Sequence, residues 1–138
     1  VWTPMFDVSN REKCLRKTEK ADKHIKRVAE MTIARKTGNF DYLRLPHWMA
    51  YWYYLTYEKQ RKTRNFHVIK DRCTGCNKCA RQCPEHAIDI ENGYPVWVKA
   101  ECTMCLRCLH HCPGFAIQYG RRTVKHGQFV YPEEMAKQ

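Results

Sequence analysis

The feature that most constrains this chain is a run of four cysteines that occurs twice, 29 residues apart. The first run, CTGCNKCARQCP, spans residues 73–84, and the second, CTMCLRCLHHCP, spans residues 102–113. Each has the spacing C-x2-C-x2-C-x3-C-P, and an Ala-Ile pair follows each run at the same distance. A fixed period of this kind indicates a duplicated structural unit, here a loop, a short helix and a strand.

The spacing within each run predicts iron–sulfur chemistry. Unbroken runs of this form, closed by proline, hold [4Fe–4S] clusters through cysteine thiolates. Structural zinc is the alternative, but zinc sites usually join two C-x2-C pairs across roughly 12–20 residues and need only four ligands. The C-x3-C-x2-C run of radical S-adenosylmethionine enzymes does not occur in the sequence. We therefore expect two [4Fe–4S] clusters, in a reducing, cytoplasmic compartment.

The geometry of a cubane indicates how the eight thiolates are shared. Three cysteines within seven residues can wrap one corner of a cluster, whereas the fourth, on the same short helix, points away. In two-cluster proteins with this run, that fourth cysteine ligates the neighbouring cluster. The predicted ligands are Cys73, Cys76, Cys79 and Cys112 for cluster 1, and Cys102, Cys105, Cys108 and Cys83 for cluster 2. Pro84 and Pro113 turn the chain away after each crossing ligand.

With all eight ligand positions matched, residues 66–120 resemble a bacterial-type two-[4Fe–4S] ferredoxin, over about 40% of the chain. The resemblance implies an α+β fold, a pseudo-twofold unit with two hairpin-like sheets and two short helices. The lysine-rich helix and the segment from Cys102 to Gly120 are similar to the C-terminal part of flavodoxin–ferredoxin fusion proteins of anaerobes. Because a flavin-binding domain precedes the ferredoxin in that family, the resemblance implies a redox partner such as a flavodoxin-like domain.

We expect a basic helical extension over residues 1–65 and a polar surface tail over residues 121–138. Apolar residues at steps of three and four predict an amphipathic helix from Arg11 to Lys36, with Thr37-Gly38-Asn39 as its C-cap. Residues 46–60 predict a second helix, rich in aromatic side chains that we expect in a core or a subunit interface. Strands are predicted at 66–69, 88–90, 95–98 and 116–119, with Asn92-Gly93 as a hairpin turn.

The net charge of +11 is concentrated in the extension. Residues 1–68 carry 15 Lys and Arg against 7 Asp and Glu, whereas residues 69–120 carry 6 against 5. Two oxidised clusters with their thiolates would add about four negative charges to the second segment. The basic arm is then either a docking surface for an acidic partner or a solvated helix face that packs its apolar stripe on the core. The apolar stretch 45–57 is too short to span a membrane, which takes roughly 20 residues.

Several single residues have both a functional and a structural interpretation. Three aromatic side chains are expected to shield the clusters from water, namely Tyr94, Trp97 and Phe115. His110 and His111 precede Cys112 and could donate to a sulfur, although solvated side chains are the expected state. Cys14 lies outside both runs and is predicted to be a plain small side chain.

These observations predict a carrier of single electrons at low potential, without catalytic residues of its own. It would act as an oxidoreductase only together with a partner domain or subunit. A second hypothesis is an electron-relay subunit or segment of a larger redox enzyme, which the long extension favours. A third is a nucleic-acid-binding protein with structural clusters, because the basic stretch 59–64 adjoins the aromatic helix. No nucleic-acid motif accompanies that stretch, so we expect no nucleic acid as a partner.

Overall fold

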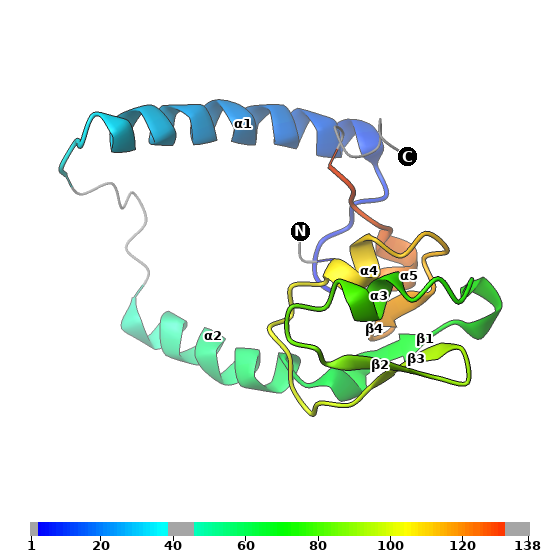
Figure 1. Cartoon of the computed structure of the whole chain (residues 1–138). Helices are drawn as coiled ribbons and strands as arrows, with labels where there is room; N and C mark the ends of the chain where they lie inside the picture. The colour runs from blue at the N-terminus through cyan, green and yellow to red at the C-terminus, as the bar shows by residue number, and fades with distance from the viewer. Residues whose placement is uncertain (1–2, 39–45, 132–138) are drawn as a thin grey trace.

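The computed structural model describes residues 3–38 and 46–131. These residues form helices and two small sheets, an α+β arrangement (Figure 1). Both sheets lie in a compact cysteine-rich unit, and two long helices, α1 and α2, extend away from it (Figure 1). None of the helices within these two ranges combines the length and the apolar character needed to cross a bilayer.

Helix α1 spans Arg11–Ile33, and its first turn is capped by a side chain. The Asn10 side-chain oxygen accepts a hydrogen bond from the backbone N–H of Lys13 at 2.9 Å, which satisfies one of the free donors at the N-terminus. The predicted apolar stripe is present but does not pack on a core. Ile25 and Val28 are more than 60% exposed, so that part of the prediction is wrong.

The predicted C-terminus of this helix is also wrong. The chain leaves the helix at Ala34, and Arg35 takes a left-handed conformation with φ of 48°. The expected cap at Gly38 is therefore not used, and Asn39 lies outside the described residues. Arg35 accepts an unfavourable backbone conformation at the position where helices often carry glycine.

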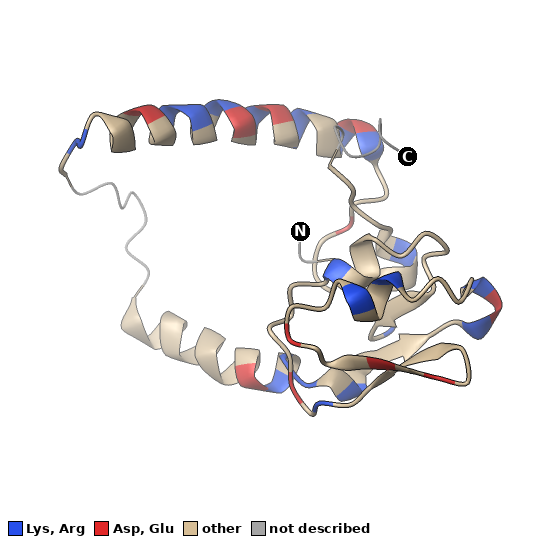
Figure 2. Cartoon of the chain, viewed as in Figure 1, with Lys and Arg blue, Asp and Glu red and all other residues tan. Residues whose placement is uncertain are grey.

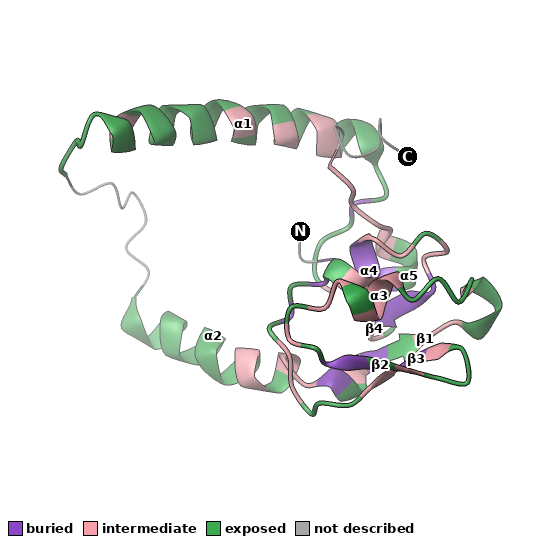
Figure 3. Ribbon diagram, in the orientation of Figure 1, coloured by how far each residue is buried: buried purple, intermediate pink, exposed green. Residues whose placement is uncertain are grey.

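Helix α2 spans His47–Gln60, with Pro46 as its N-cap, close to the predicted range. None of its residues is buried (Figure 3). Its aromatic side chains therefore do not form a core within the described part of the chain, contrary to one of the two expectations. The other expectation, an interface, stays a prediction.

Two antiparallel pairs of strands make up the sheets. Strand β1 (Phe66–Val68) pairs with β4 (Ile117–Tyr119), and β2 (Ile88–Glu91) pairs with β3 (Tyr94–Trp97). All four predicted strands are present, with β3 shifted by one residue. The turn between β2 and β3 is confirmed: Asn92 and Gly93 have φ of 52° and 82°, as a primed two-residue turn requires.

A small core joins the two sheets around Phe66. The ring of Phe66 stacks on Trp97 of β3, with centroids 5.1 Å apart, and meets the edge of Tyr119 in β4 at 5.0 Å. The buried hydrophobic cluster comprises Phe66, Met104, Leu106, Leu109, Ile117 and Tyr119. Because both sheets and the second cysteine run contribute to this core, the cysteine-rich segment folds around one apolar centre.

The segment after Gly120 is not only a polar surface tail. It forms a short helix, α5 (Thr123–His126), and Thr123 is fully buried. The Thr123 hydroxyl donates to Gln118 Oε1 at 2.7 Å and accepts from the Tyr119 N–H at 2.9 Å. Further on, the Tyr131 hydroxyl lies within 2.9 Å of both carboxylate oxygens of Asp22 in α1, so the tail connects the unit to that helix.

Gly114 provides a test of the packing between the two halves of the unit. A Cβ at Gly114 would overlap the carbonyl oxygen of Arg72, a backbone atom that cannot move aside as the end of a flexible side chain could. We predict that Gly114→Ala displaces this loop and lowers the unfolding temperature, at a cost of about 1–3 kcal/mol or more. Calorimetry of the reconstituted variants measures the effect.

The matched control is Asp71→Ala, in the short 3-10 turn Lys70–Arg72 that Gly114 approaches. This substitution adds no atoms and lies at an exposed site, so its effect should stay within about 0.5 kcal/mol. Equal unfolding temperatures for the two variants would contradict the close approach.

Candidate iron–sulfur sites

The two cysteine runs fold into the same local structure. Helices α3 (Lys78–Arg81) and α4 (Arg107–His110) each form one short turn within a run, and each follows a left-handed residue with φ of 57°. The left-handed residues of the runs and their continuations form three pairs spaced by the repeat: Gly75 and Met104, Asn77 and Leu106, His86 and Phe115. Each run therefore bends back on itself before its helical turn, which gathers its first three cysteines around a common point.

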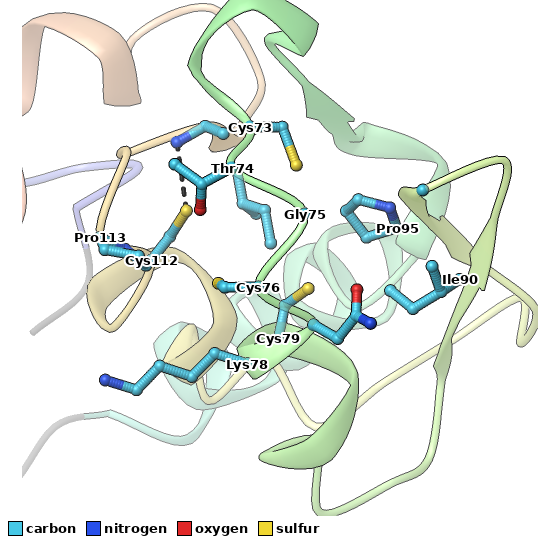
Figure 4. Close-up of a pocket in the computed structure, with 14 residues that line it drawn as sticks. Cys73, Thr74, Gly75, Cys76, Lys78, Cys79, Ile90, Pro95, Cys112 and Pro113 are labelled. Atoms are coloured by element: carbon cyan, nitrogen blue, oxygen red, sulfur yellow. Dashed lines mark hydrogen bonds between the residues drawn. The ribbon is translucent and has the colours of Figure 1, made fainter.

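Four cysteines line one cavity of the unit. Cys73, Cys76 and Cys79 come from the first run, and Cys112 comes from the end of the second. Figure 4 shows their side chains surrounding a shared space, with Ile90 and Pro95 on the far wall. The predicted ligands of cluster 1 are thus neighbours in the fold. Apolar side chains from β2 and β3 close the side opposite Cys112.

The other four cysteines of the runs line a second cavity. Cys102, Cys105 and Cys108 come from the second run, and Cys83 comes from the end of the first. Its apolar wall is formed by Phe66, Ile88, Trp97 and Leu106. The fold therefore divides the eight cysteines into two sets of four, and the last cysteine of each run lies with the other run.

The donors around each cavity fit a [4Fe–4S] cluster. Four soft thiolates are the ligands that such a cluster takes. In the described ranges, no three His, Cys, Asp or Glu side chains come close enough together to hold a single metal ion. The four thiols are instead spread over the cavity wall. This arrangement fits a [4Fe–4S] cluster, because its four iron atoms lie at different corners of the cube and each takes one thiolate.

Backbone amides donate to the sulfur of the two crossing cysteines. The Ala87 N–H donates to Cys83 Sγ, and the Ala116 N–H donates to Cys112 Sγ, both at 3.3 Å; the dashed line in Figure 4 marks the second bond. Such bonds stabilise negative charge on sulfur and help to set the potential of a bound cluster. The sequence analysis missed these donors, although the repeated Cys-Pro-x-x-Ala spacing indicates them.

The thiols differ in how readily they ionise without metal. Burial raises the pKa of Cys79 and Cys102, and raises that of Cys108 furthest. In contrast, the pKa of the more exposed Cys76 is lowered, mainly because the backbone N–H of Lys78 donates a hydrogen bond to its sulfur. Because metal binds the thiolate, loading of the buried positions must displace protons and is favoured as the pH rises.

A glutamine from the tail supports one run only. Gln128 Nε2 donates to the carbonyl oxygens of Leu109 and Cys112, both at 2.7 Å. The next residue, Phe129, donates its N–H to His110 Nδ1 at 3.1 Å. These contacts fix the end of α4 beside the first cavity. The sequence around Gln128 does not predict these hydrogen bonds, because their acceptors lie 16 and 19 residues earlier in the chain.

The structure corrects the expectation for His110. This side chain is buried, with 7% of its surface exposed, and is not solvated as the sequence analysis predicted. His111 is half-buried. Cys14 is half-buried on α1, where its thiol lies 3.6 Å from the Val8 carbonyl oxygen. It lines neither cysteine cavity.

The three aromatic residues expected to shield the clusters take different positions. Trp97 lines the second cavity directly. Phe115 packs against the hydrophobic core instead, and Tyr94 lies beneath the Lys70 ammonium, which is 5.3 Å from the ring centroid. Tyr94 and Phe115 are not part of the walls of these two cavities. Of these three aromatic residues, Trp97 is the one placed to shield a cysteine cavity from water directly.

One known family model matches part of the chain. Residues 67–113 match the family model of a 4Fe-4S dicluster domain, a range that contains both cysteine runs. The match supports a ferredoxin-like iron–sulfur segment within the chain. No curated protein and no solved structure matches the chain significantly.

Paired substitutions test how the cysteines are shared. Cys73 and Cys112 line the same cavity, whereas Cys73 and Cys83 belong to the same run but line different cavities. We predict that Cys73→Ser with Cys112→Ser leaves one cluster, and about four iron atoms per chain, after anaerobic reconstitution. Cys73→Ser with Cys83→Ser should damage both clusters and leave far less iron. Iron and sulfide analysis distinguishes them, and the reverse order would show that each run ligates its own cluster.

Proposed function

We propose that this protein carries single electrons at low potential through two [4Fe–4S] clusters. The observation that carries the proposal is the division of eight cysteines into two cavities, each completed by the last cysteine of the other run. When bound, the clusters would supply reversible one-electron chemistry. The repeated loops and helical turns favour a pseudo-twofold arrangement of the two sites. The protein itself would break and form no substrate bonds.

The residues of the chain would hold the clusters and tune them. The eight cysteines would act as ligands, and the crossing pair, Cys83 and Cys112, would tie the two halves together. The apolar walls would limit the access of water to the more buried side of each cavity, whereas Cys76 and Cys105 face solvent. The amides of Ala87 and Ala116 would stabilise charge on the crossing sulfurs. The two sites share these features, so differences in potential would come from their unequal surroundings.

The partner that we propose is a redox protein, such as a flavodoxin-like flavin domain. The resemblance to flavodoxin–ferredoxin fusion proteins supports this choice. Exposed basic side chains on α1, among them Lys17, Lys20 and Lys23, would steer an acidic partner towards the unit. In this proposal residues 66–120 are the two-cluster domain, residues 1–65 a docking extension and residues 121–138 a C-terminal segment. The chemistry suits the reducing cytoplasm of an anaerobe.

The second candidate is an electron-relay subunit or segment of a larger redox enzyme. The exposed apolar side chains of α1 and α2 favour it. Exposed apolar patches usually mark interaction sites, and subunits of a larger enzyme would cover them. The distinction is whether the isolated chain exchanges electrons with a soluble acceptor or only within an assembly.

Anaerobic reconstitution tests the proposed function directly. We predict about eight iron and eight sulfide per chain, and clusters that a low-potential reductant reduces reversibly by one electron each. Potentiometric titration followed by electron paramagnetic resonance measures this. The matched control is the Cys73→Ser, Cys83→Ser double variant, which should give little signal. Retention of zinc alone, or clusters that no reductant can reach, would rule out electron transfer.

A further inference from the structure

Helix α2 leaves a continuous set of large apolar side chains uncovered. Trp48, Tyr51, Trp52 and Tyr53 are each exposed by 62–65%, and Met49, Tyr54 and Leu55 are also exposed. Single exposed apolar residues are ordinary, but a contiguous patch of this kind marks an interaction site. The question is which partner covers it.

Helical spacing divides this surface into two faces. Trp48, Tyr51, Trp52 and Leu55 follow the i, i+3, i+4, i+7 pattern and therefore lie along one side of the helix. We call these four residues the α2 seam. The opposite side carries Tyr53, Tyr54 and Tyr57, whose hydroxyls can bond to water. The seam is therefore the face with more to gain from burial.

The distribution of charge fits a second copy of the same helix. Residues 47–57 contain no Lys, Arg, Asp or Glu, so two seams can meet without burying any of these charges (Figure 2). Basic residues follow at the C-terminal end, beginning with Lys59 and Arg61. In an antiparallel pair these ends lie about 20 Å apart, one at each end of the 14-residue helix. A parallel pair would bring them together and align the helix dipoles unfavourably.

The exposed area is sufficient for a specific but reversible contact. A Trp or Tyr side chain presents roughly 150–250 Å², so the three aromatic residues of the seam leave about 300–500 Å² uncovered per copy. With Leu55 and the flanking side chains, two copies can bury about 1,000 Å² in total, near the lower limit for a biological interface. An interface of this size is expected to dissociate on dilution.

We propose that α2 pairs antiparallel with α2 of a second copy through the seam, giving a symmetric dimer. The end of α2 is fixed to the unit, because the Cys102 N–H donates to the Arg61 carbonyl oxygen at 3.0 Å and Glu101 pairs with Arg61 and Lys62. The dimer therefore holds the two cysteine-rich units at opposite ends of the helix pair, where each can meet a redox partner. This inference does not depend on the redox role of the clusters.

A matched pair of variants tests the seam. Trp52→Glu places a charge on the seam, and Tyr53→Glu places the same charge on the opposite face, at sites exposed by 64% and 62%. Sedimentation velocity of the reconstituted full chain, from about 1 to 100 µM, should show a dimer for the parent protein and for Tyr53→Glu. For Trp52→Glu the dissociation constant should rise at least about tenfold. Circular dichroism and iron content should be unchanged in both variants, which separates this test from that of the proposed function.

Three outcomes would overturn the proposal. The parent chain could stay monomeric up to about 100 µM, the highest concentration of the series. The two variants could weaken the dimer equally, which would point to a contact on another face. The parent chain could instead float with vesicles of anionic phospholipid without self-association, and α2 would then serve a membrane surface.

Discussion

The fold depends on the exchange of one cysteine between the two halves of the cysteine-rich unit. Cys83 leaves the first run to line the cavity of the second, and Cys112 does the reverse. Neither cavity is complete without a residue from the other half. The close approach of Gly114 to Arg72 and the pairing of β1 with β4 hold the segment that carries Cys112 beside the start of the first run.

Bound clusters would add stability to so small a unit. Within the described residues, the central hydrophobic cluster comprises six buried side chains, and a core of that size gives a small unit only marginal stability. Metal clusters supply folding free energy in small domains of this kind, since a preformed site rarely exists in the unfolded chain. Burial raises the pKa of the Cys79, Cys102 and Cys108 thiols, so binding of a cluster at these positions must release protons.

The two long helices relate differently to the unit. The end of α2 is held beside the second cavity through Arg61 and Cys102, whereas the middle of α1 is held through the tail, by Tyr131 and Asp22. The tail also reaches Cys112 through Gln128, so each helix is connected to a different cavity.

The sequence by itself determined the parts of the structure that depend on local spacing. The cysteine period, the turn at Asn92-Gly93 and the short strands follow from patterns within a few residues, and the structure contains them all. The burial of His110 and Thr123, the Gln128 contacts and the exposure of α2 were decided only by the tertiary structure. These features depend on which distant segments of the chain come into contact, and the pattern of neighbouring residues does not predict those contacts. The end of α1 belongs with them, since Arg35 rather than a glycine takes the left-handed conformation.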